Sequence, residues 1–292
     1  MLQKSVLLRQ VWKNNLKYEF SLIKSCLPYF CVVSLDTEYP GSVYKSTIKK
    51  EFLSQASPQD IYSIMKRNVD ELKVLQFGLT LSDANGTLPS FGTGFYYMWQ
   101  FNFSDFDLER DLNDEESIKF LEKQGMDFKM LREKGIHSSE FIRLLVSTGL
   151  VMNRYSNLIW ITFHGCYDLG FLVKLLSKKK LPDDIGSFLG LVRYYLGYRI
   201  YDLKLMSYFN GLYGGLEKIA NLLNVCRVVG KSHQAGSDSL LTLQCFMTLM
   251  DVYAIGFNSF YYSGYVKRYC NGYEGLMYGL CQQIVTHNPP YS

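Results

Sequence analysis

Apolar and polar residues follow two different periods along this chain. Runs rich in β-branched and aromatic residues predict strands at residues 30–38, 73–82, 97–103, 158–163 and 199–202. Helical spacing of apolar residues, with start signals such as Ser57–Pro58, predicts helices at 9–25, 58–72, 168–176, 216–223 and 234–250, and a helical character for the charged stretch 104–150. Strands interleaved with helices indicate an α/β protein.

The turn signal at Asp83–Gly86 joins the second and third predicted strands as a hairpin, so we expect a mixed sheet. Residues 42–57 are polar and are expected to form an exposed loop. No linker or internal repeat interrupts the pattern, which favours one domain over residues 1–283. Residues 284–292, which include Pro289–Pro290, are expected to form a loose tail.

Composition narrows the class of protein. The formal net charge of +4 permits a nucleic-acid partner without arguing for one. The seven cysteines are scattered and form no Cys-x-x-Cys pair, which disfavours a zinc site and a disulfide framework. Charges interrupt every apolar stretch near the N-terminus, and the least charged region, 239–266, is too polar for a membrane span. We therefore expect a soluble protein of the cytoplasm or nucleus with no membrane partner.

Two acidic residues at the end of the first predicted strand are the most informative feature. Asp36 and Glu38 are separated by one residue, so their side chains point to the same side of the strand. Pro40–Gly41 then ends the pairing. Because two carboxylates held side by side repel each other, a bound divalent cation is the common reason for such a pair.

Three further residues lie at the ends of predicted elements. Asp168 follows the strand 158–163, and His233 and Asp238 precede or open the last long helix. Taken singly, an aspartate near a helix start is usually a cap, and a lone histidine is usually structural. Taken together, strand acids, acids at helix starts and a nearby histidine are typical of two-metal nucleases.

These residues sit in segments that resemble a known family. The chain is similar to the DEDD exonucleases of the ribonuclease H-like fold, in the subtype with a catalytic histidine, and more narrowly to the Pop/Caf-type poly(A)-specific deadenylases of the CCR–NOT complex. The resemblance spans roughly residues 9–280, and the blocks around Asp36 and His233 are its most specific parts. The matching segments are 9–16, 36–41, 68–79, 99–103, 163–170, 214–216 and 233–242.

The resemblance implies a fold and a mechanism. The fold would be ribonuclease H-like, with a central mixed β-sheet flanked by helices on both faces. Asp36, Glu38 and Asp238 would hold one divalent cation, Mg²⁺ or Mn²⁺, and Asp36 with Asp168 would hold a second. His233 would take a proton from the attacking water. The activity would be removal of 5′-AMP from the 3′ end of poly(A) RNA, and the partners would be the scaffold subunit of the CCR–NOT complex and a nuclease subunit with leucine-rich repeats.

Other interpretations stay open at this point. The chain could be a catalytically silent scaffold of the same fold, or a DEDD exonuclease acting on other RNA or DNA 3′ ends. His164 and Asp202 match the family as well, and we expect structural hydrogen bonding and helix capping from them. The abundant tyrosines could stack on bases, but the pattern does not indicate which ones do.

Overall fold

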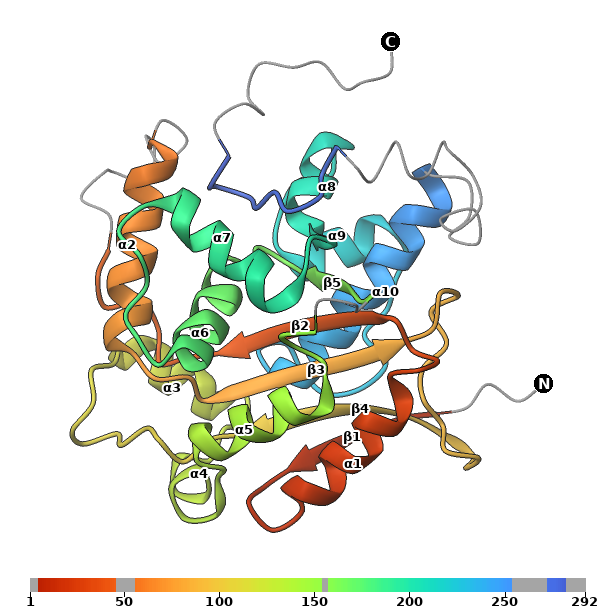
Figure 1. Cartoon of the computed structure of the whole chain (residues 1–292), viewed down its shortest axis with the longest axis horizontal. Helices are drawn as coiled ribbons and strands as arrows, with labels where there is room; N and C mark the ends of the chain where they lie inside the picture. The colour runs from red at the N-terminus through yellow and green to blue at the C-terminus, as the bar shows by residue number, and fades with distance from the viewer. Residues whose placement is uncertain (1–4, 46–55, 154–156, 254–271, 282–292) are drawn as a thin grey trace.

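The computed structural model describes residues 5–45, 56–153, 157–253 and 272–281. Its centre is a six-stranded sheet in the order β1-β4-β3-β2-β5-β6 (Figure 1). The pairs β2/β3 and β3/β4 are antiparallel, whereas β1/β4, β2/β5 and β5/β6 are parallel, so the predicted mixed sheet is confirmed. The strands are β1 (Ser5–Val11), β2 (Val32–Glu38), β3 (Gln76–Ser82), β4 (Phe95–Asn102), β5 (Ile159–Thr162) and β6 (Ile200–Asp202).

Helices cover both faces of this sheet, as expected. The helices are α1 (Leu16–Cys26), α2 (Pro58–Glu71), α3 (Glu115–Lys123), α4 (Phe128–Lys134), α5 (Ser138–Thr148), α6 (Cys166–Ser177), α7 (Ile185–Leu196), α8 (Leu203–Phe209), α9 (Leu216–Leu222) and α10 (Ala235–Tyr253). In Figure 1, α1, α5 and α6 lie in front of the sheet and α10 lies behind it. The two largest apolar cores lie around Phe101 and Phe141 and around Met98 and Phe246, and a smaller cluster includes Phe106. Within the described residues, no helix combines the length and the apolar character needed to cross a membrane.

The sequence prediction was wrong at the N-terminus. Residues 9–11 belong to the edge strand β1, and the helix predicted from residue 9 begins at Leu16. The strand escaped notice because its apolar and polar residues do not alternate: the apolar residues 6–8 are followed by Arg9 and Gln10. Helices α7 and α8 were also missed, and α7 contains two glycines and several aromatic residues that weaken a helical pattern. The predicted tail 284–292 and most of the loop 42–57 lie outside the described residues.

The first turn of α10 lies directly on the sheet because β3 has a glycine at the contact. Gly78 pairs with Asp36 across β2 and β3. A Cβ atom added at Gly78 would lie 1.9 Å from the carbonyl oxygen of Ala235. Gly236 N–H, in the same turn, donates to Gln100 Oε1 at 3.1 Å. This close approach carries Asp238, one turn further along α10, to the end of β2.

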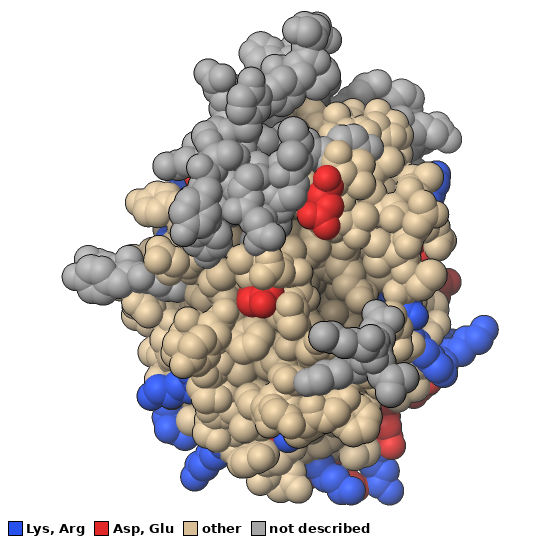
Figure 2. Space-filling model, turned by 90° about the vertical axis from the view of Figure 1, so that its right-hand side faces the viewer, with Lys and Arg blue, Asp and Glu red and all other residues tan. Residues whose placement is uncertain are grey.

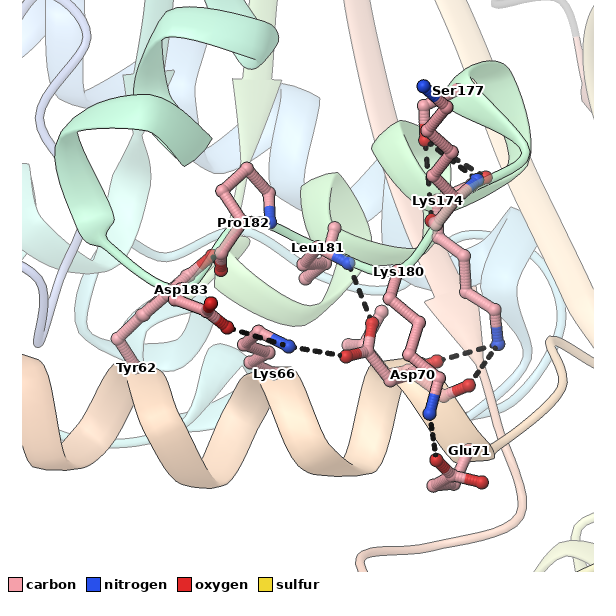
Figure 3. Close-up of polar contacts among 12 residues, drawn as sticks. Tyr62, Lys66, Asp70, Glu71, Lys174, Ser177, Lys180, Leu181, Pro182 and Asp183 are labelled. Carbon is pink, nitrogen blue, oxygen red and sulfur yellow. Dashed lines mark hydrogen bonds and ion pairs between the residues drawn. The ribbon is translucent and has the colours of Figure 1, made fainter.

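A lysine-centred network holds α6 against α2 (Figure 3). Lys174 Nζ, from α6, donates to three backbone carbonyls at the end of α2 at 2.8–3.0 Å. Asp70 Oδ2 accepts from Lys66 Nζ, and its Oδ1 accepts from the backbone N–H of Leu181, both at 2.8 Å. Because these contacts satisfy the free carbonyls of α2, they fix the position of α6, which carries Asp168 in its first turn.

We expect Gly78→Ala to destabilise the protein by about 1–3 kcal/mol, because the new methyl group overlaps the backbone of α10. Urea unfolding followed by circular dichroism measures the change. Gly190→Ala in α7 is the matched control, since a Cβ there meets nothing within 4 Å and should stabilise the helix slightly. Equal free energies of unfolding for the Gly78→Ala protein and the wild type would contradict the close approach.

Candidate active site

The end of β2 presents consecutive residues to opposite faces of the sheet. Asp36 and Glu38 point to the face covered by α10, and Thr37 between them points to the face covered by α6. Thr37 donates both its backbone N–H and its Oγ1 hydroxyl to Asp168 Oδ1, at 2.7 and 2.6 Å. The residue between the first two acids therefore positions the third, although Asp168 comes from a different element.

Asp238 and His233 are joined by the loop that leads into α10. The backbone N–H of His233 donates to Asp238 Oδ2 at 3.0 Å. His233 has a φ of +60°, a left-handed conformation that the loop must hold, and its ring meets the Phe120 ring edge-on at 4.8 Å between centroids. Ligand atoms of Glu38, His233 and Asp238 all lie within 4.8 Å of one another. The first turn of α10 and the loop before it thus place a carboxylate and an imidazole beside the acids of β2.

These side chains border a cleft of about 600 Å³, large enough for a nucleotide-sized group. Asp168 does not line this cleft and lies behind Thr37. The rest of the wall is mixed, with aromatic and apolar side chains beside polar ones that include Lys45 and Asp114. The lining includes Asp36, Glu38, Tyr39, Phe120, Phe163, Gly215, His233 and Asp238.

Burial raises the pKa values of the four acids, and repulsion from the other acids raises those of Asp36 and Glu38 further. Burial, followed by repulsion from Asp168, Asp238 and Glu38, raises the pKa of Asp36 well above its ordinary value. Burial likewise raises the pKa of Glu38, and it raises the pKa of Asp168 to about 7. Such a cluster is costly to ionise, and divalent cations relieve the cost. Because the donors are carboxylate oxygens, the set suits Mg²⁺ or Mn²⁺.

Arg227 is a residue of this site that the sequence did not reveal. Its guanidinium Nη2 lies 2.6 Å from Asp238 Oδ1, and it also donates to Glu217 and to Ser237 Oγ. Burial raises the pKa of Asp238, and the charge of Arg227 opposes that rise. Arg227 stands in the segment between α9 and α10, in no regular element and with no periodic spacing to the acids, so no sequence pattern indicated it.

His164 and Asp202 have the structural roles expected of them. Asp202 Oδ1 accepts from the backbone N–H groups of His164 and Lys204, at 2.8 and 3.0 Å. Its Oδ2 accepts from the backbone N–H of Tyr278 at 3.0 Å. Asp202 therefore caps α8 and ties three chain segments together beside the cleft.

Comparisons with known proteins place the chain among similar sequences and structures. The family described as CAF1 family ribonuclease matches residues 11–143. Probable CCR4-associated factor 1 homolog 10 of Arabidopsis thaliana is 43% identical over 277 residues, covering 94% of this chain and 93% of that protein. Poly(A) ribonuclease pop2 of Schizosaccharomyces pombe is 38% identical over 251 residues, covering 85% and 71%.

Solved structures give the same picture. S. pombe Pop2p in its Mg²⁺- and Mn²⁺-bound form superposes with a TM-score of 0.80 at 36% identity, covering 94% of this chain and 99% of that one. Yeast CAF1, co-crystallised with the MIF4G domain of NOT1, superposes with a TM-score of 0.70 at 31% identity, covering 93% and 96%. The predicted ribonuclease H-like fold is confirmed by these likenesses.

Without cations, we expect the stability of the protein to fall as the pH rises. The folded carboxyl groups keep their protons to higher pH than in the unfolded chain, so stability present below about pH 4 is lost as the pH rises through about 7, where Asp168 ionises. Each group adds a slope of up to about 1.4 kcal/mol per pH unit. Thermal unfolding in EDTA across this range measures the loss, and millimolar Mg²⁺ should reverse it. The Asp168→Asn protein should show a flatter profile. If the melting temperature changed neither with pH nor on addition of Mg²⁺, the result would count against a shared cation site.

We expect Arg227→Gln to lower the stability of the metal-free protein by about 3–5 kcal/mol, since it leaves a buried carboxylate without its cation. The melting temperatures in EDTA and in Mg²⁺ should then differ more than they do in the wild type. Arg132→Gln removes an arginine from an exposed ion pair with Asp107 and is the control, with little expected change. Equal melting temperatures of the Arg227→Gln and Arg132→Gln proteins in EDTA would show that Arg227 does not compensate the charge of Asp238.

Proposed function

The chain belongs to the CAF1 family of ribonucleases, and from this premise we propose that it is a poly(A)-specific 3′-to-5′ exoribonuclease that shortens mRNA tails. The observation that carries the proposal is the convergence of Asp36, Glu38, Asp168 and Asp238 beside His233 at one end of the sheet. These carboxylates, of which Glu38, Asp168 and Asp238 are buried and Asp36 is partly buried, have no stabilising use there without cations. The poly(A) specificity is supported by the name of the S. pombe relative.

The acids are proposed to bind two divalent cations. Asp36, Glu38 and Asp238 would hold one, and Asp36 with Asp168 would hold the other. When bound, the cations supply positive charge that neutralises the acids and the phosphate under attack. Thr37 keeps Asp168 oriented towards this position through two hydrogen bonds, and the charge of Arg227 reduces the repulsion at Asp238.

His233 is proposed to act as the general base. It is the exposed member of the group, its backbone is held by Asp238, and its ring is braced by Phe120. The imidazole accepts a proton from a water molecule as that water attacks the last phosphodiester in line. The bond between phosphorus and the 3′ oxygen breaks, so the shortened RNA leaves with a 3′ hydroxyl and the released nucleotide is 5′-AMP.

We also propose the partners of a CCR–NOT deadenylase. Because yeast CAF1 was crystallised with the MIF4G domain of NOT1 and this chain matches nearly all of that protein, the scaffold subunit is the first expected partner. A nuclease subunit with leucine-rich repeats is the second. The proposed place of action is the cytoplasm and the nucleus, where polyadenylated mRNA is found.

We expect Asp36→Asn or Asp238→Asn to lower kcat on oligo(A) by at least about 10²–10³-fold, because each removes charge that the cations need. The fold should be retained, as judged by circular dichroism. Asp251→Asn, at an exposed acid further along α10, should keep full activity.

Three substrates of equal length separate the proposal from its alternatives. Oligo(A) should be degraded faster than oligo(U), and both faster than DNA, in a Mg²⁺-dependent reaction. Equal rates on RNA and DNA would favour a general DEDD exonuclease. Wild-type protein without activity on any of them would favour the silent scaffold, and an active Asp36→Asn protein would contradict the assigned site.

A further inference from the structure

An aromatic cluster that the mechanism does not use lies near Phe163, a residue of the cleft wall. Strands β2, β5 and β6 are parallel, so their carboxyl ends meet at one edge of the sheet. Asp36 and Glu38 end β2, His164 follows β5, and Lys204 follows β6. Since ligands of such sheets bind beyond the carboxyl ends of the strands, a substrate chain that reaches the acids can pass Lys204 on leaving.

Lys204 is a partly buried cation beside the cleft. Its Nζ lies 4.7 Å from the centroid of the Tyr278 ring, 5.8 Å from that of Phe163, which lines the cleft, and 3.4 Å from His164 Nδ1. Among the described residues it forms no ion pair with a carboxylate. The carboxylate oxygens of the neighbouring Asp202 accept hydrogen bonds from backbone N–H groups. The ammonium group therefore touches no carboxylate among the described residues, although the nearby charge of Asp202 opposes the lowering of its pKa by burial, and it can donate to a phosphate oxygen from outside.

Exposed tyrosines extend this cluster outward. Tyr208 and Tyr213 are 41% and 57% exposed, and their rings meet edge-to-face at 5.3 Å. The Tyr208 ring also contacts that of Tyr278, at 6.0 Å. Tyr213 stands two residues before Gly215, which forms part of the cleft wall. A row of aromatic rings thus runs from the cleft wall to solvent, and exposed rings beside a cation suit stacked bases and their phosphates.

We propose that Lys204, Tyr208, Tyr213 and Tyr278 form a subsite for single-stranded RNA that holds nucleotides on the 5′ side of the bond being cleaved. Lys204 Nζ binds a backbone phosphate, and the exposed tyrosine rings stack on bases. This proposal rests on the proposed nuclease function. It explains how a protein of modest net charge can bind single-stranded RNA.

Figure 2 shows the side of the molecule away from the catalytic acids. The centre of that face shows acidic and uncharged side chains, and its lysines and arginines lie mainly along the lower part. Tyr29, which is 75% exposed, stands close to the start of β2, at the end of that strand away from the acids. It is a matched exposed tyrosine for control experiments.

Binding of 5′-fluorescein-labelled octa-adenylate, measured by anisotropy in EDTA, tests the subsite. Tyr213→Ala should raise Kd roughly fivefold or more, because a stacked base is lost, and Tyr213→Phe should restore most of the affinity. Lys204→Gln should weaken binding and reduce the slope of log Kd against log salt by about 0.7, the loss of one phosphate contact on a single strand. Tyr29→Ala should leave Kd and slope unchanged.

Chain length gives a second readout. In Mg²⁺, Tyr213→Ala should lower kcat/KM more on octa-adenylate than on a dinucleotide, which is too short to reach the row of rings. If Tyr213→Ala and Lys204→Gln behave like Tyr29→Ala in both assays, the subsite is wrong, while wild-type activity would still support the proposed function. If the wild type cleaves no RNA, the proposed function fails, and the anisotropy series still decides whether the tyrosines bind RNA.

Discussion

The structure depends on one electrostatic constraint, the crowding of four carboxylates at the end of β2. Burial raises the pKa values of Asp36, Glu38, Asp168 and Asp238, and repulsion from the other acids adds to the rise at Asp36 and Glu38, so the group is unfavourable by itself. A fold that keeps such a group must recover its cost through a ligand. Divalent cations match both the charge and the oxygen chemistry of the site, which links the stability of the protein to the reaction proposed for it.

Different parts of the fold bring each acid into place. Strand alternation sets Asp36 and Glu38 on one side, and Thr37 between them binds Asp168 from the other. Gly78 allows α10 to lie against β3, which brings in Asp238. Arg227 then offsets part of the negative charge. The site is therefore assembled by backbone approach and hydrogen bonding as much as by its own residues.

The sequence could predict the parts of this arrangement that depend on local pattern. Alternation placed Asp36 and Glu38 on one side of a strand, and the Ser57–Pro58 signal marked the start of α2, which the structure confirms with a capping box. The sequence could not show which distant residues lie close together in space. Asp168 and Asp238 were grouped with Asp36 and Glu38 from their places near helix starts and a nearby histidine, and the resemblance assigned their roles, but nothing in their spacing shows that α6 and α10 meet at β2. Edge strand β1 and Arg227 were missed because their roles depend on neighbours that are distant in the sequence. A local pattern of apolar and polar residues does not reveal such neighbours.

Crystals soaked in Mn²⁺ test the central claim most directly, since anomalous scattering locates manganese without reference to activity. We expect two peaks at the end of β2, one within bonding distance of Asp36, Glu38 and Asp238 and one within bonding distance of Asp36 and Asp168, about 3.5–4 Å apart. Absence of any peak among these carboxylates at millimolar Mn²⁺, with their side chains unchanged, would contradict it.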